Sequence, residues 1–246
     1  MTTSAVLLRT SALIIAAGLG LTACSSDEPS QPETTDTELS GPPAPETTPE
    51  ETALAETLES DFEVKAVETL HDQWPDIVAM SSALSNTDEP DQCQEAGASQ
   101  YNLILDAEPA NVQASFTDDA LVDQQATGET LTVFYANDQA SADQLQQVHE
   151  DTDTACITED DSEVDHEESS DEIDNQSVEI HTWQIVVSGQ LTGRVVDVVG
   201  EDIYVRYASS YPPQVMIDEV DDDVADFNEE ATARAVTAFE EAAAAQ

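Results

Sequence analysis

The sequence predicts an α+β fold, in which an antiparallel sheet has helices packed on one face. Helix-like and strand-like segments follow the order helix, strands, helix, strands, helix along the 246 residues, and grouped strands favour this class. Residues 194–199 and 202–208 flank a connection so short that it fits only an antiparallel hairpin. Gly200 is expected to supply the unusual backbone angles of that turn. Apolar and polar side chains alternate through residues 203–207, as in a half-buried strand.

The first half of the folded body is predicted to begin with helices. Apolar residues recur at helical spacing over residues 54–74, and Pro75 is expected to end this helix. A second helix is predicted over residues 76–84, followed by a polar loop over residues 85–100. Three short strand-like runs come next, at residues 101–107, 111–117 and 129–135.

The second half is predicted to contain a helix, a hairpin sheet and a final helix. Ser141 is a good N-cap for a helix that runs to about residue 151. Residues 157–177 carry ten Asp or Glu and no Lys or Arg, which predicts an acidic loop of little order. A strand follows at residues 178–187. After an acidic connection at residues 216–224, an alanine-rich helix is predicted over residues 226–244, with its apolar face on the sheet.

The N-terminus has the pattern of a secretory signal peptide. Residues 1–23 carry a single charge, Arg9, and their apolar run spans residues 12–21. That run is too short for a helix that crosses a bilayer, which needs about 20 residues. One basic residue, a short apolar run and small residues before a cleavage point predict export from the cytoplasm.

The residues Leu21-Thr22-Ala23-Cys24 resemble the bacterial lipobox, in which a leucine and two small residues precede a cysteine. The resemblance implies that the thiol of Cys24 is acylated and that a peptidase cuts between Ala23 and Cys24. Two or three acyl chains would anchor the protein stably in membrane lipid. The alternative is a plain signal peptide in which Cys24 is incidental.

Residues 24–55 are predicted to form a disordered, acidic tether, which leaves residues 56–246 as a single domain. Six of the eleven prolines lie in residues 25–50, and Leu39 is the only large apolar side chain there. Such a composition buries too little apolar surface to offset the entropy of ordering the chain.

The charge of the chain is strongly negative, with 54 acidic and 5 basic residues and a net charge of −49. Nucleic-acid binding by phosphate neutralisation is excluded, because it requires clustered Lys and Arg. Anionic lipid headgroups should also repel the folded body. Cations, basic peptides, basic proteins and neutral ligands remain as partners. Adaptation to high or variable salt is the simplest explanation of the charge, and a cation-storing or cation-sensing role is the alternative.

Cys93 and Cys156 remain as a pair once Cys24 is assigned to the anchor. Disulfides form and persist in oxidising compartments, so an exported chain is expected to join these two residues. The loop that the bond would close is long, and the chain-entropy model gives a stabilisation of about 4 kcal/mol. Two buried, unbridged thiols are the alternative. The isolated cysteines do not have the spacing of a metal site.

No residue pattern indicates an enzyme, a cofactor or a metal. The chain has no H-x-x-x-H or G-x-S-x-G pattern, and its carboxylates are too numerous for any pair to stand out as a glycosidase dyad. Asp151 and Asp153, with the acidic run after them, lack the glycine and ligand spacing of an EF-hand calcium loop. His181 and Trp183 share one face of a predicted strand, which we interpret as packing or a solvent-facing pair.

The folded body also resembles a known group of exported domains. The residues that carry the resemblance are the run at 131–135, the helix from Ser141, Cys156 beyond it, the paired strands at 193–196 and 203–207, and the final alanine-rich helix. Over about residues 75–245 the chain is similar to sensor-type domains of actinobacterial lipoproteins and to PknH-like extracellular sensor-type domains. It departs from them in having one cysteine pair instead of two and a long acidic insert. The resemblance implies ligand sensing or an interaction in the cell envelope, and no catalytic residues.

The sequence therefore predicts a membrane-anchored cell-envelope lipoprotein whose extracytoplasmic domain binds or senses a ligand without catalysis. Its expected partners are membrane lipid, through acylated Cys24, and an envelope ligand or protein of unknown identity. Two alternatives remain open. One is an envelope hydrolase that uses a carboxylate pair, and the other is a charged structural spacer.

Overall fold

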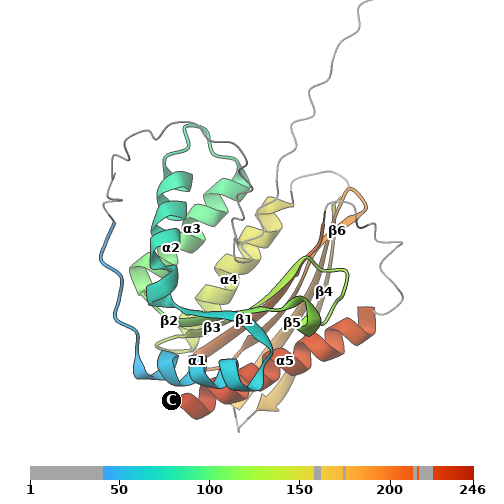
Figure 1. The fold of residues 1–246 in the computed structure, drawn as a ribbon. Helices are drawn as coiled ribbons and strands as arrows, with labels where there is room; N and C mark the ends of the chain where they lie inside the picture. The colour runs from blue at the N-terminus through green and yellow to red at the C-terminus, as the bar shows by residue number, and fades with distance from the viewer. Residues whose placement is uncertain (1–40, 158–161, 174–175, 213–214, 216–223) are drawn as a thin grey trace, which may run out of the picture.

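The computed structural model describes residues 41–157, 162–173, 176–212, 215 and 224–246. Within them, seven strands form one sheet in the order β1-β2-β3-β7-β6-β5-β4, and every neighbouring pair is antiparallel (Figure 1). The strands are β1 (Val64–Thr69), β2 (Ala110–Phe116), β3 (Gly128–Tyr135), β4 (Ser162–Ile173), β5 (Gln176–Val187), β6 (Gln190–Val199) and β7 (Ile203–Ser210). The α-helices are α1 (Pro49–Asp61), α2 (Leu70–Ser85), α3 (Gln92–Ala107), α4 (Gln139–Cys156) and α5 (Val224–Ala245). The predicted α+β class with an antiparallel sheet is confirmed.

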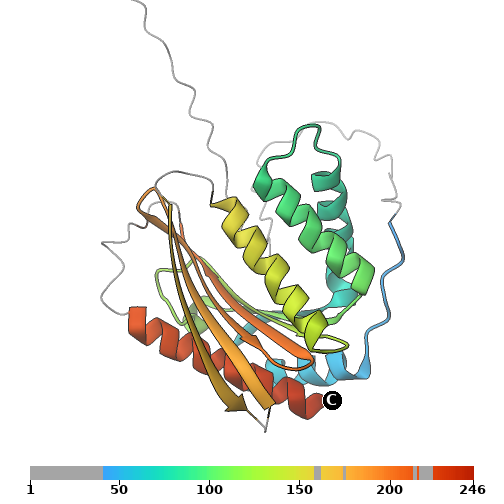
Figure 2. The same cartoon turned by 180° about the vertical axis from the view of Figure 1, so that it is seen from behind.

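The helices cover both faces of the sheet, whereas one covered face was expected. On β7, Ile203, Val205 and Tyr207 belong to the core under α1 and α5, while Tyr204 belongs to a second core with residues of α2, α3 and α4. Figure 2 shows α4 and α3 on the side of the sheet opposite α5. Consecutive positions of β6 and β7 are buried, so these strands need cover on both faces, as strands do that are apolar throughout.

The folded part begins before residue 56, which corrects the predicted boundary of the tether. Helix α1 starts at Pro49, where Thr48 and Glu51 form a capping box, and Leu54 is fully buried in the core. The chain before α1 lies against α2, since Nε1 of Trp74 donates to the carbonyl of Pro42 at 2.9 Å. A Thr-Pro pair is a signal for a helix start as well as a feature of tethers. Residues 24–40 lie outside the described residues.

The predictions for residues 54–107 were wrong in three places. The expected helix over 54–74 is interrupted by β1, which pairs with β2, and Pro75 lies inside α2 rather than after a helix. Residues 92–107, which cover most of the predicted loop at 85–100 and all of the predicted strand at 101–107, form α3. Asp91 starts this helix because its side chain accepts a hydrogen bond from the backbone N–H of Gln94 at 2.9 Å, and local capping outweighs the polar composition.

The predicted disulfide is present and joins α3 to α4. Cys93 lies in the first turn of α3 and Cys156 is the last residue of α4, with an S–S distance of 1.96 Å and a Cα–Cα distance of 4.3 Å. Helix α3 packs on α2 and α4, and α4 packs on β6 and β7. The disulfide therefore fastens the outer helix to one that lies directly on the sheet.

The acidic run at residues 157–177 contains a strand where a loop was expected. Residues 162–173 form β4, and each of them pairs with a residue of β5. Main-chain hydrogen bonds to β5 are enough for an edge strand whose side chains face solvent. Residues 158–161 and 174–175 lie outside the described residues.

The remaining strand and helix predictions agree with the structure to within a few residues. Strands β2, β3, β5, β6 and β7 and helices α4 and α5 lie where patterns predicted them, and residues 216–223 of the acidic connection lie outside the described residues. The role assigned to Gly200 was wrong, because its φ is not positive. A Cβ at this position would instead lie 2.5 Å from Cζ of Phe239. Among the described helices, none is long and apolar enough to cross a membrane.

Candidate functional site

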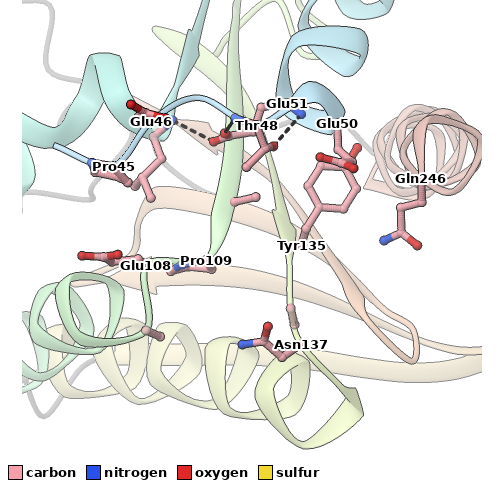
Figure 3. Close-up of a pocket in the computed structure, with 14 residues that line it drawn as sticks. Pro45, Glu46, Thr48, Glu50, Glu51, Glu108, Pro109, Tyr135, Asn137 and Gln246 are labelled. Atoms are coloured by element: carbon pink, nitrogen blue, oxygen red, sulfur yellow. Dashed lines mark hydrogen bonds between the residues drawn. The ribbon is translucent and has the colours of Figure 1, made fainter.

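A cavity of about 410 Å³ opens between the start of α1, the turn from α3 into β2 and the loop from β3 to α4 (Figure 3). Its apolar lining includes Leu70, Pro109, Ala110 and the ring of Tyr135. Acidic side chains of Glu46, Glu50, Glu51 and Glu108 line it as well. Five separate parts of the chain meet here, namely residues 45–51, Leu70, residues 107–110, residues 135–137 and Gln246, so the cavity exists only in the folded chain.

Glu51 builds the inner wall of this cavity and is not free to bind a ligand. Its Oε2 accepts the N–H of Thr48 at 2.7 Å, and its Oε1 accepts the N–H groups of Leu70 at 3.3 Å and Asn111 at 2.9 Å. The residue is 2% exposed. One carboxylate thus ties α1, α2 and β2 together through hydrogen bonds from three backbone N–H groups.

The other three carboxylates give the cavity an acidic rim. No described hydrogen bond or ion pair engages the side chains of Glu46, Glu50 and Glu108, and none of the described lining residues is Lys or Arg. Figure 3 shows Glu50 directly beside the ring of Tyr135. Burial, then the nearby charges of Glu50 and Glu51, raises the pKa of Tyr135, so its hydroxyl stays neutral. An apolar floor with a negative rim suits a ligand that has an apolar body and a positive charge.

Arg206 lies in a buried cluster on the face of the sheet that α4 covers. Its Nη1 donates to Asp197 at 3.2 and 3.3 Å, and its Nη2 donates to Asp153 of α4. Burial raises the pKa of Asp197 to about 6, although the charge of Arg206 acts in the opposite direction. Burial, then the charge of Arg206, lowers the pKa of His149 to about 3, so this imidazole is neutral. This cluster holds α4 to β6 and β7.

A second buried cluster lies under α5 and uses the other two described arginines. Nη1 of Arg194 donates to Oδ2 of Asp123 at 3.0 Å, and Nη1 of Arg234 lies 3.9 Å from Oε2 of Glu129. Glu129 also accepts the hydroxyl hydrogen of Tyr207 and the N–H of Asp123, and burial raises its pKa. The three arginines therefore neutralise buried carboxylates, which leaves the described surface dominated by acidic side chains.

The residues singled out from the sequence fall into separate places. Ala23 and Cys24 lie outside the described residues, and the Cys93–Cys156 bond lies between α3 and α4. Asp153 is engaged by Arg206, and Asp151 accepts from the side chain of Gln147 at 3.0 Å, so both suspected calcium ligands have protein partners. In the described part of the chain, no group of three or more His, Cys, Asp or Glu side chains could hold a metal ion.

The cavity was missed in the sequence, although one signal for it was present. The Thr48-x-x-Glu51 pattern of a capping box marked a helix start inside the predicted tether. The other lining residues come from segments that are far apart in the chain, and no local pattern brings them together.

Comparison with known proteins found no similar protein. No family model, no curated protein and no solved structure matches the chain. The resemblance to sensor-type domains therefore stays a prediction, and function is inferred from the residues and their geometry.

Proposed function

We propose that the chain is a lipid-anchored protein of the cell envelope whose folded part binds a ligand on the extracytoplasmic side without converting it. The anchor rests on the lipobox-like residues that end in Cys24. The disulfide between Cys93 and Cys156 supports export, because such bonds persist in oxidising compartments. Metabolic labelling with a fatty-acid analogue should mark the wild-type protein. Labelling that persists after Cys24→Ala would contradict the anchor.

The cavity carries the proposal for ligand binding, and its lining favours an organic cation. Glu46, Glu50 and Glu108 attract positive charge from three directions, while the ring of Tyr135 and Pro109 offer apolar contact. An amine on a hydrocarbon chain, or a basic side chain of a peptide, has both properties. Aromatic rings add a further attraction for a cation near their faces.

A binding role is favoured over a carboxylate-pair hydrolase by the position of the perturbed carboxyl groups. The described carboxyls with a raised pKa are Glu129 and Asp197, and burial is the main cause for both. Each of them is hydrogen-bonded to a tyrosine beneath a helix, and neither lines the cavity. A hydrolase of this kind needs two carboxyl groups in one cleft.

Calorimetry with hexylammonium tests the cavity directly, with hexanol and hexanoate as probes of the same length. Hexylammonium should bind saturably and the other two should not. Glu50→Gln/Glu108→Gln should weaken binding about tenfold, in line with the loss of close charge partners in a partly enclosed site. The matched control, Glu89→Gln/Glu95→Gln, removes the same net charge away from the cavity. An equal loss in the control, or no saturable binding at all, would favour a charged spacer.

A further inference from the structure

Two histidines face each other on the outer strands of the sheet, away from the cavity. His166 of β4 is exposed, and its Nε2 lies 3.2 Å from Nδ1 of His181 on β5. The ring of His166 stacks on that of Trp183, with centroids 3.7 Å apart and planes 5° apart. Strand pairing places His166 opposite Trp183 and His181 opposite Glu168, so the two histidines are diagonal neighbours on one face.

We propose that His166 and His181 bind a divalent transition-metal ion, namely Cu²⁺, Ni²⁺ or Zn²⁺. The ligand atoms are Nε2 of His166 and Nδ1 of His181. Imidazole nitrogen is a donor that these ions prefer, whereas Ca²⁺ and Mg²⁺ prefer oxygen. This site is independent of the cavity and of the organic cation proposed for it.

The separation of the two nitrogens fits a shared ion. With metal–nitrogen bonds of about 2.0–2.1 Å and an angle between about 90° and 110°, the nitrogens lie roughly 2.9–3.4 Å apart. The observed 3.2 Å falls within that interval. Without a metal, one of the two nitrogens donates its hydrogen to the other. The ring planes are nearly parallel, 9° apart, so the rings must tilt for their lone pairs to converge on an ion, and exposed His166 can do so by leaving its stack on Trp183.

Binding requires a particular tautomer of each ring. Each neutral imidazole presents a lone pair to the ion and keeps its hydrogen on the other nitrogen, which is Nδ1 in His166 and Nε2 in His181. Oε2 of Glu179 lies 3.8 Å from Nε2 of His181 and favours a hydrogen at that nitrogen. A carboxylate behind a metal-binding histidine is a common arrangement that orients the ring and raises its basicity.

The surroundings are negative, and water completes the coordination. Glu168 pairs with His181 on one side and Asp197 pairs with it on the other, so a carboxyl group flanks this ligand on each neighbouring strand. The protein supplies two ligands, because no group of three or more donor side chains in the described residues could hold an ion. The remaining positions are therefore open to solvent or to a further ligand.

The test is a Cu²⁺ and Ni²⁺ titration of the full chain with Cys24→Ser, which removes a competing thiol, and with calcium in excess to occupy surface carboxylates. Calorimetry should show one saturable site for each ion. His166→Gln and His181→Gln should each weaken binding at least tenfold, while His71→Gln, at another exposed histidine, should leave it unchanged. The electron paramagnetic resonance spectrum of bound Cu²⁺ should show coupling to two nitrogens in the parent and to one in each single variant.

Trp183 provides an independent readout, since it touches a proposed ligand and the only other tryptophan is Trp74. Cu²⁺ should quench the emission of Trp183, and Trp183→Phe should abolish this quenching while calorimetry still detects the ion. The proposal is overturned if no saturable binding survives excess calcium, or if His166→Gln binds as tightly as the parent. The cavity variant Glu50→Gln/Glu108→Gln should bind the metal normally, so failure of either proposal leaves the other standing.

Discussion

Strands β7 and β4 lie in the same sheet and have opposite compositions. Strand β7 (Ile203–Ser210) is central, with helices over both faces, and all of its residues except Ser210 are buried. Strand β4 (Ser162–Ile173) is an edge strand, and its residues 163–172 are exposed while Ile173 reaches the core. Six residues of β4 are Asp or Glu. Acidic side chains thus fill an outer strand on which no helix packs, and pairing with β5 holds this segment in the sheet, with Ile173 as its contact with the core.

The difference in burial between β7 and β4 also determines whether a charged side chain needs an oppositely charged partner. Arg206 on β7 is 8% exposed and is neutralised by Asp197 and Asp153. The acids of β4 are hydrated and need no partner. We therefore expect charge changes on β7 to alter stability strongly and charge changes on β4 to alter it little.

The largest expected effect is that of Arg206→Met. The substitution leaves Asp197 and Asp153 without their cation, and breaking one partner of a buried ion pair costs about 3–5 kcal/mol of unfolding free energy. Urea unfolding at neutral pH measures the loss. The control is Lys65→Met on the other edge strand, β1, where the side chain is exposed and the change should stay within about 0.5 kcal/mol. Equal losses of unfolding free energy in the two variants would show that a charge on the central strand matters no more for stability than a charge on an edge strand.

The second prediction concerns acid sensitivity at the same cluster. His149 is buried between Phe134 and Tyr204, and burial, then Arg206, lowers its pKa to about 3. Below its ordinary pKa of about 6.5, the unfolded chain takes up a proton there that the folded chain does not. Stability should therefore fall as the pH drops from about 6.5 to about 3, by about 2 kcal/mol between pH 6.5 and 5 from this group.

His149→Gln should remove that part of the pH dependence, whatever its effect on stability at pH 7. Asp197 acts in the opposite direction, because its raised pKa lets the folded chain bind a proton near pH 6 before the unfolded chain does. The relevant quantity is therefore the difference in slope between wild type and variant, measured by urea unfolding at several pH values. Parallel slopes would show that His149 is not held neutral in the fold.

The contrast between β7 and β4 explains what the sequence could and could not predict. Strand β3 and the β6–β7 hairpin were recognised because buried strands carry a period-two or continuous apolar pattern. The presence of β4 was missed because an edge strand without a buried face has no such pattern, and its acidic composition resembles a loop. Helix α3 was missed in the same way, since its signal was the Asp91–Gln94 capping box and not its apolar content.

The sites were less predictable than the fold, and for a physical reason. The Cys93–Cys156 pair could be inferred because two cysteines in an exported chain allow one partner each. The cavity and the His166–His181 pair are made by residues from different strands and loops, and their proximity depends on strand register. The sequence predicted that His181 and Trp183 lie on the same face of a strand. His166 lies beside them because β4 pairs with β5, which no sequence pattern predicted.

The third prediction tests how closely a helix approaches the central strands. A Cβ on Gly200, before β7, would lie 2.5 Å from Cζ of Phe239 on α5, whereas a Cβ on Gly128 would meet Oγ of Ser210 at 3.8 Å, an ordinary contact. Gly200→Ala should therefore destabilise the protein by at least about 1 kcal/mol through overpacking. Gly128→Ala is the control and should be neutral or stabilising by up to about 1 kcal/mol. Thermal unfolding of the two variants distinguishes a crowded interface from a loose one.

The smallest expected effect on stability is that of Glu163→Gln/Glu167→Gln on β4. Both side chains are exposed, so the unfolding free energy should change by less than about 0.5 kcal/mol. Within the described residues no further strand pairs with the outer edge of β4, and charged side chains on such edges prevent pairing with another copy. The variant should therefore self-associate at protein concentrations where the wild type is monomeric.

Analytical ultracentrifugation of this β4 variant beside Glu229→Gln/Glu230→Gln provides the comparison. The second variant removes the same charge from exposed positions on α5, so general loss of repulsion would act on both, while edge pairing would act on β4 alone. Added salt should promote association of the wild type as well, because it screens the acids of β4. Association of both variants to the same extent would mean that the net charge of the protein, and not the position of the charges on the edge of β4, prevents self-association. A loss of more than about 1 kcal/mol in the β4 variant alone would instead make these acids part of the fold, since exposed side chains rarely cost that much.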